Sequence, residues 1–70
     1  MGNELLALYY YNHNKYYVYG CWDEETPENK IEFYDLYELP FGEDNLICIN
    51  EGEPFYTLPT RDEVIEFINQ

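Results

Sequence analysis

Residues 5–22 read LLALYYYNHNKYYVYGCW, and this stretch decides the fold. It holds six of the nine tyrosines and the only tryptophan, and it contains no acidic residue. Aromatic and β-branched side chains favour strands. Asparagine tolerates the positive φ angles of tight hairpin turns, so residues 12–15 (NHNK) are typical of a turn. The stretch therefore predicts a β-hairpin of residues 4–11 and 16–22 whose two faces are both apolar or aromatic.

A hairpin tip at His13 and Asn14 predicts the register of the two strands. Tyr11 then lies opposite Tyr16, and the small Ala7 lies opposite Gly20, which leaves a dip on that face. Tyrosines fall on both faces, and tyrosine and tryptophan are favoured anchors at protein interfaces. The candidate aromatic anchors are Tyr9, Tyr11 and Tyr16 on one face, Tyr10, Tyr17 and Tyr19 on the other, and Trp22 near the open end.

The rest of the chain predicts two more strands and a short edge segment. Residues 30–38 and residues 46–50 are strand-like runs, separated by a turn at Pro40 and Gly42. Residues 51–54 (EGEP) form a second turn, and residues 55–58 are an extended segment that adds a short edge strand. The pattern predicts an antiparallel sheet of four strands.

The C-terminal residues carry the clearest helix signal in the chain. Thr60 is followed three residues later by Glu63, which is a capping box, and Pro59 lies just outside it. An apolar stripe at helical spacing then runs from Val64 to Ile68. We expect a single domain over residues 1–70 of the α+β class: a four-stranded antiparallel sheet that begins with the hairpin, with one C-terminal helix packed on one face.

The net charge of −12 comes from 15 acidic against three basic residues, and it is unevenly placed. Glu4 and Lys15 cancel within residues 1–22, so the whole net charge lies after residue 22. Solubility alone accounts for a charge of about 2–8 in a small domain. An acidic surface repels nucleic acid and attracts a basic protein. The candidate partner-binding residues are Asp23, Glu24, Glu25, Glu28, Glu32, Asp35, Glu38, Glu43 and Asp44, together with Tyr34 and Tyr37.

The residue types that catalysis or metal binding requires are largely missing. There is no serine, and the only histidine, His13, lies on the hairpin turn far from Cys21. Zinc needs three or four closely spaced Cys or His ligands. The acids of residues 23–28 lack the alternating order of a calcium loop. We therefore predict no enzymatic activity, no cofactor and no metal.

Two further expectations concern the thiols and the compartment. The chain starts without the basic region of a signal peptide, and no apolar run approaches the length of a membrane span. A cytoplasmic protein without a membrane partner is expected. Cys21 and Cys48 are then expected to be free thiols, although they can pair if their strands are neighbours.

In size, acidity and aromatic content, the chain resembles small phage-encoded inhibitors that occupy nucleic-acid-binding sites. This class includes uracil-DNA glycosylase inhibitors, anti-restriction proteins and anti-CRISPR proteins. The resemblance rests on no shared motif, so it transfers no functional residues. It implies a stoichiometric anti-defence inhibitor that acts as a DNA mimic.

The leading hypothesis is a non-enzymatic protein that inhibits a basic partner, expected to be a nucleic-acid-handling host factor, by acidic mimicry with aromatic anchors. It does not bind nucleic acid directly. One alternative is a small homo-oligomeric subunit, such as a homodimer, whose aromatic sheet face is a permanent interface and whose charge serves solubility. The other is a protein that sequesters a small ligand such as a nucleotide in an aromatic pocket.

Overall fold

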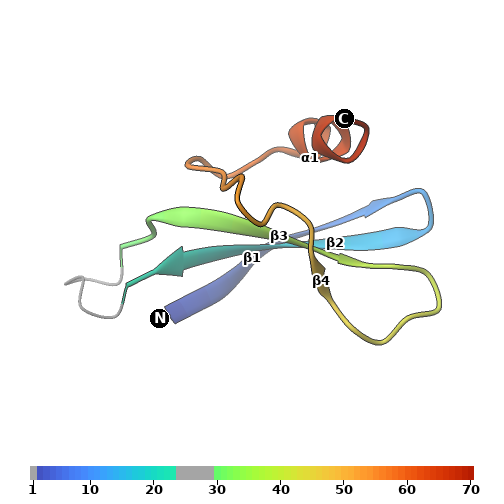
Figure 1. The fold of residues 1–70 in the computed structure, drawn as a ribbon, viewed down its shortest axis with the longest axis horizontal. Helices are drawn as coiled ribbons and strands as arrows, with labels where there is room; N and C mark the ends of the chain where they lie inside the picture. Colours follow the sequence, from blue (N-terminus) through green and yellow to red (C-terminus); the bar gives the residue numbers. More distant parts are fainter. Residues whose placement is uncertain (1, 24–29) are drawn as a thin grey trace.

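The computed structural model describes residues 2–23 and 30–70, and it shows one antiparallel sheet with a short helix. The sheet is a meander in which each strand pairs with the next along the chain. Its elements are β1 (Gly2–Tyr11), β2 (Asn14–Trp22), β3 (Phe33–Leu39), β4 (Ile47–Cys48) and α1 (Arg61–Ile68). The helix α1 lies over one face of the sheet (Figure 1). The predicted α+β fold is confirmed.

The tip of the hairpin lies one residue earlier than predicted. Asn12 and His13 have φ angles of 53° and 70°, the positive values that both central residues of a type I′ turn require. The turn joins Tyr11 to Asn14, so the prediction of a tip at His13 and Asn14 was wrong. Near the tip, the residue paired with Tyr11 is Asn14 and not the predicted Tyr16, so the pairing is shifted by two residues. Because side chains alternate with a period of two, this shift leaves each tyrosine on its predicted face.

A β-bulge changes the register in the middle of the hairpin. The pairing shifts between Leu5 and Ala7, so that Ala7 lies opposite Val18 and Glu4 lies opposite Gly20. The predicted Ala7–Gly20 pair was therefore wrong. A bulge adds one residue to one strand only, and a pattern of aromatic residues on both faces does not indicate where that residue lies.

The predicted dip at Gly20 is filled by neighbouring side chains. A Cβ atom at this position would lie 2.8 Å from the side chains of Leu6 and Ile31. Because Gly20 has no side chain, Leu6 and Ile31 can pack directly against β2 at this position. Any larger residue there would displace them.

The core lies between the sheet and α1. Tyr16, Val18, Leu36 and Val64 are fully buried, and half-buried apolar residues such as Phe67 pack around them. The predicted capping box is present, with the Glu63 N–H donating to Thr60 Oγ1 at 3.2 Å and the Thr60 N–H donating to Glu63 Oε1 at 2.9 Å. The box fixes where α1 begins, and the buried apolar residues fix which of its sides faces the sheet.

The fourth strand is shorter than predicted, because β4 has only two residues. Beyond them, the side chain of Asn50 makes the hydrogen bonds to β3. The buried Asn50 accepts the Leu36 N–H at 2.9 Å through Oδ1 and donates to the Tyr34 carbonyl at 3.1 Å through Nδ2. These are bonds that a further strand residue would make. The chain then arches away and returns at Phe55, which forms an isolated bridge with Tyr34 in place of the predicted edge strand.

Candidate functional site

The two faces of the sheet differ in what covers them. The covered face packs against α1 and carries Tyr9, Tyr11 and Tyr16. The opposite face, here called the open face, has no helix over it in the part of the chain that the structure describes (Figure 1). By the strand registers, the open face carries Leu5, Leu8, Tyr10, Tyr17, Tyr19, Phe33, Asp35 and Tyr37.

The tyrosines of the covered face use their hydroxyl groups within the fold. The Tyr9 hydroxyl donates to the Pro59 carbonyl at 3.2 Å, just before the helix begins. The Tyr16 hydroxyl donates to Glu38 Oε2 at 2.8 Å. The Tyr11 hydroxyl accepts a hydrogen bond from Asn69 Nδ2 at 3.3 Å, just after the helix ends. This face therefore holds the two ends of α1 and half-buries the carboxylate of Glu38.

The tyrosines of the open face present their rings instead. Tyr10 is 60% exposed, and the rings of Tyr19 and Tyr37 meet edge to face with centroids 5.5 Å apart. Within the described residues, the hydroxyl groups of Tyr10, Tyr17 and Tyr19 make no hydrogen bond. Such rings offer apolar area and an unused polar group together, as interface anchors do.

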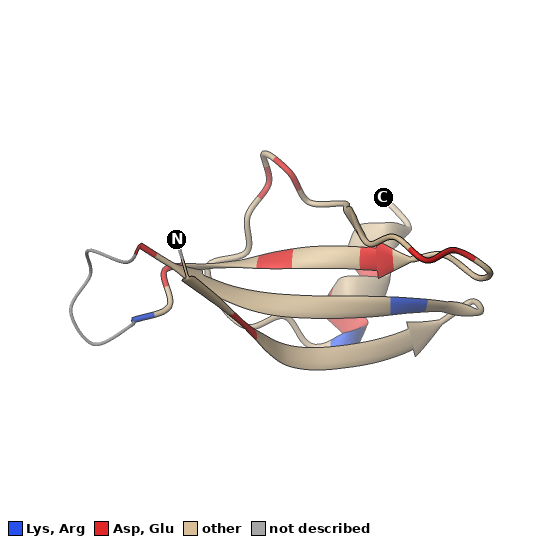
Figure 2. Cartoon of the chain, turned by 90° about the horizontal axis from the view of Figure 1, so that it is seen from below, with Lys and Arg blue, Asp and Glu red and all other residues tan. Residues whose placement is uncertain are grey.

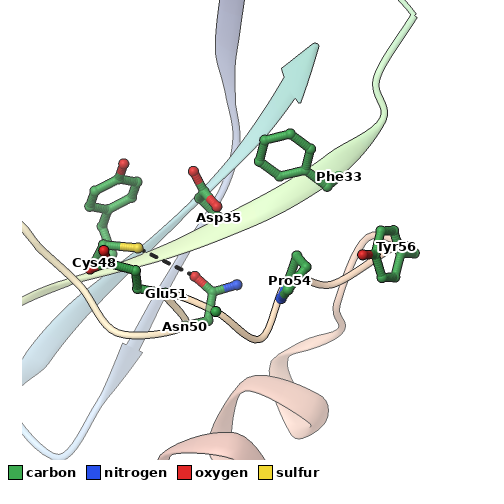
Figure 3. A pocket seen from close by; sticks show the side chains of 9 residues that line it. Phe33, Asp35, Cys48, Asn50, Glu51, Pro54 and Tyr56 are labelled. Carbon is green, nitrogen blue, oxygen red and sulfur yellow. Dashed lines mark hydrogen bonds between the residues drawn. The ribbon is translucent and has the colours of Figure 1, made fainter. Parts of the chain in front are cut away.

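A groove of about 590 Å³ lies at the β3–β4 end of the open face (Figure 3). Its floor is the open-face side of β3, and its wall is the arch of residues 50–56. Phe55 turns its ring toward Phe67 of the helix, with centroids 5.5 Å apart, so the next residue, Tyr56, is directed the other way and lines the groove. The lining residues are Phe33, Asp35, Tyr37, Cys48, Asn50, Glu51, Gly52, Pro54 and Tyr56.

Asn50 builds this groove although sequence reasoning did not select it. Besides its bonds to β3, its Nδ2 reaches the Glu53 carbonyl at 3.5 Å and its Oδ1 accepts from Cys48 Sγ at 3.5 Å (Figure 3). The side chain thus ties the start of the arch to β3 and to the Glu53 carbonyl within the arch. The sequence predicted Asn50 as the last residue of the strand-like run 46–50, and its partners on β3 are 14 and 16 residues away.

The groove is lined by two carboxylates, the exposed Glu51 and the half-buried Asp35. This half-buried carboxylate accepts a hydrogen bond from Cys21 Sγ at 3.5 Å. Burial, and after it the charge of Asp35, raises the pKa of the Cys21 thiol to about 11 and also raises the pKa of Tyr37. Burial raises the pKa of Cys48 as well, and Asp35 adds to it. Three neighbouring groups are therefore held in their neutral, protonated forms.

The remaining predicted acids lie mostly at the rim of the sheet (Figure 2). All the described acidic residues except Asp35 and Glu38 are exposed. Glu43 and Asp44 lie in the loop before β4, and Glu51 and Glu53 lie in the arch after it. Asp23 and Glu32 meet at the other end, where the Asp23 N–H donates to Glu32 Oε1 at 3.3 Å. Glu24, Glu25 and Glu28 lie outside the described residues.

The other predicted aromatic residues lie away from the groove or contribute only backbone to it. The half-buried Trp22 contacts Gly2, where any side chain would meet the indole ring. Tyr34 points into the core on the covered face, and its backbone bonds to Phe55 and Asn50. Of the aromatic residues selected from the sequence, the structure therefore places only Tyr37 in the groove itself, and it adds Phe33 and Tyr56.

In residues 2–23 and 30–70, the remaining polar groups form no second site of comparable build. The exposed His13 meets the ring of Phe41 with centroids 6.4 Å apart, in a hollow of about 260 Å³ that Lys15 and Glu43 also line. Cys21 and Cys48 are free thiols on either side of β3, opposite Phe33 and Tyr37 respectively. Among the described residues, no group of three or more His, Cys, Asp or Glu is placed to hold a metal ion. No helix in these residues has the length and apolar content that crossing a bilayer requires.

Comparison of the chain with models of known protein families, with curated proteins and with solved structures found no match.

Proposed function

We propose that this protein is a non-enzymatic inhibitor that binds a basic, nucleic-acid-handling protein through the groove and the two acidic loops beside β4. The observation that carries the proposal is that exposed acids stand beside exposed aromatic rings in both of the loops that flank β4. Phe41 is 82% exposed beside Glu43 and Asp44, and Tyr56 is 75% exposed beside Glu53. Carboxylates steer a basic partner, and aromatic rings anchor it after contact.

The distribution of basic residues supports the same proposal. Lys15 lies 6.0 Å from the Tyr10 ring, and Arg61 donates to the Tyr10 carbonyl at 3.1 Å, so both cations contact Tyr10, which is not among the residues that line the groove. The side chains around the groove include two carboxylates and no cation. A site of this kind favours positive charge on its partner, and DNA-binding surfaces are rich in Lys and Arg.

The test is affinity capture from a bacterial lysate with the immobilised chain, followed by elution with salt or with double-stranded DNA. Captured proteins should be released by rising salt, because exposed charges are screened within about 10 Å at 0.1 M. They should also be released by DNA, because mimicry requires a shared site. Capture that persists at high salt, or that DNA leaves unchanged, contradicts the proposal.

Two matched double variants locate the surface. Glu51→Gln with Glu53→Gln removes two charges from the arch, whereas Glu4→Gln with Glu66→Gln removes two exposed charges on the side of the sheet that carries α1. Both variants have the same net charge. We expect the first to weaken capture and the second to leave it nearly unchanged, and equal weakening would assign the effect to net charge alone.

A second candidate function, a homo-oligomeric subunit, is favoured by the exposed apolar side chains of β1. Leu5, Leu8 and Tyr10 are 47%, 39% and 60% exposed on the open face. Salt separates the two functions, because screening strengthens the association of copies that each carry −12 and weakens binding to a basic partner. Light scattering at low and high salt should show a monomer throughout, and a dimer that grows with salt supports the second function instead.

A further inference from the structure

We propose that the groove beside β4 binds a single organic cation, the guanidinium or ammonium group of a basic side chain of the partner. The proposal rests on the proposed function for the source of that side chain. The lining of the groove supports the cation site by itself, so the free cation should bind in the absence of any partner.

The lining supplies the two features by which proteins recognise organic cations. Three aromatic side chains, Phe33, Tyr37 and Tyr56, line the groove from β3 and from the arch. Rings of this kind attract a cation placed over their faces within about 6 Å. Figure 3 shows Phe33 on β3 with Asp35 beside it, and Tyr56 on the arch beyond Pro54.

The carboxylate of Asp35 lies in this groove without a cation of its own among the lining residues. It is half-buried, and the donor that reaches it is the neutral Cys21 thiol at 3.5 Å. A partly desolvated carboxylate is costly unless a positive charge or strong donors compensate it. Burial together with this carboxylate keeps Cys21 protonated, so the thiol adds no second negative charge. An incoming ammonium or guanidinium group would supply the missing counter-charge.

The second carboxylate gives the groove a negative charge on its wall as well as on its floor, where Asp35 lies. Glu51 lies in the arch, is exposed, and directly follows the buried Asn50. A groove of about 590 Å³ is within the range of about 300–1,000 Å³ found for small-ligand sites. It therefore has room for a whole arginine or lysine side chain, whose aliphatic stem would lie against the rings.

A nucleotide fits this lining poorly, although aromatic rings can stack on a base. Its phosphates would meet Asp35 and Glu51, and none of the lining residues is basic. The same chemistry that favours a cation therefore disfavours the predicted alternative of nucleotide sequestration. Binding of a cationic ligand can therefore be compared directly with binding of a nucleotide.

The test is a titration of the isotope-labelled chain followed by amide and side-chain NMR shifts. The ligands are N-acetyl-arginine methylamide, N-acetyl-lysine methylamide, the neutral citrulline analogue of the first, and AMP. We expect saturable shifts at Asp35, Asn50 and Tyr56 with the two cations only. Equal affinity for citrulline, preferential binding of AMP, or shifts confined to other parts of the chain would overturn the proposal.

Matched variants assign the binding to the groove. Tyr56→Ala removes an aromatic ring that is 75% exposed, and Tyr10→Ala removes one that is 60% exposed and does not line the groove. We expect the first to weaken cation binding by about fivefold and the second to leave it unchanged. Asp35→Asn should weaken it by about tenfold or more, and Asp35→Glu should restore part of the affinity.

The outcome is separable from that of the proposed function. If the free cations do not bind but the Glu51→Gln and Glu53→Gln variant still loses capture, the groove is not a cation site and the acidic surface remains the partner site. If the cations bind and no basic protein is captured, the groove site stands and its source of cation is not a protein partner.

Discussion

Tyr16 and Tyr17 are adjacent in β2, yet the two faces of the sheet give them opposite surroundings. Tyr16 is 1% exposed under α1 and donates to Glu38, whereas Tyr17 is half-buried on the open face and its hydroxyl makes no bond to the described residues. The same contrast holds for Tyr9 and Tyr10. One residue type therefore serves as core on one side and as surface on the other, and composition alone does not separate the two roles.

The largest expected difference between the faces comes from shortening one leucine on each. Leu36→Ala removes a fully buried side chain from the core and should lower the free energy of unfolding by about 2–5 kcal/mol. Leu8→Ala removes a side chain that is 39% exposed on the open face and should cost less than about 1 kcal/mol. Urea unfolding followed by far-UV circular dichroism measures both.

A small domain has only about 0.05–0.15 kcal/mol of stability per residue, so Leu36→Ala can leave the chain unfolded. Leu36→Val is the milder variant, and it should still destabilise the protein more than Leu8→Ala does. Equal costs at the two positions would mean that the open face is covered in solution, as the homo-oligomer hypothesis requires.

The next largest effect is expected at Asn50, a buried residue on which the shape of the open face depends. Asn50→Ala leaves the Leu36 N–H and the Tyr34 carbonyl without their partners, and such buried groups cost about 1–3 kcal/mol. The exposed Asn45 is the control, and Asn45→Ala should be nearly neutral. Unfolding free energies measure the cost, and amide exchange of Leu36 reports the lost bond. Slow exchange of Leu36 in the Asn50→Ala variant would contradict the role given to this side chain.

Local signals in the sequence predicted most of the fold, and long-range side-chain bonds account for what they missed. The capping box joins Thr60 to Glu63, which are three positions apart, so its whole pattern can be read from neighbouring residues. The tip of the hairpin was ambiguous because residues 12–14 read Asn-His-Asn, and each pair in that run tolerates positive φ. The bonds of Asn50 to β3 cross 14 and 16 residues, and no local pattern marks them.

The candidate site was less predictable than the fold for the same reason. The exposed acids and the tyrosines on both faces were visible in the sequence, but the groove depends on where the arch of residues 50–56 returns to β3. Phe33 and Tyr56 were not selected because each reads as an ordinary strand or loop residue. Only the pairing of Phe55 with Tyr34 brings Tyr56 next to the far side of β3.

A smaller difference is expected when only the hydroxyl groups are removed. Tyr16→Phe deletes the donor to Glu38 at 2.8 Å and should lower the free energy of unfolding by about 1 kcal/mol. The loss should be no larger, because Glu38 is only half-buried and water can replace the lost donor. Tyr17→Phe on the open face should change stability by less than about 0.5 kcal/mol. Urea unfolding of the two variants side by side measures the difference. A cost at Tyr17 as large as that at Tyr16 would show that its hydroxyl has a partner after all.

The most local test concerns the thiol of Cys21, which is buried although it belongs to the open-face side of β2. Burial and Asp35 raise its pKa from 9.0 to about 11. The native state therefore holds the thiol proton more tightly than the unfolded chain does. The resulting contribution to stability is fully present below pH 9.0 and is lost as the pH rises toward about 11.

The Cβ carbon shift of labelled cysteine measures this titration directly in a Cys48→Ala variant, where Cys21 is the one remaining thiol. We expect a midpoint near 11 in the folded protein and near 9.0 in urea. Asp35→Asn should lower the folded midpoint, because it removes the charge that opposes the thiolate. A folded midpoint near 9.0 would show that water reaches Cys21 from the open face and that Asp35 is solvated there. In that case a helix would still cover only one face, but the groups at the centre of the open face would be as accessible to water as its rim.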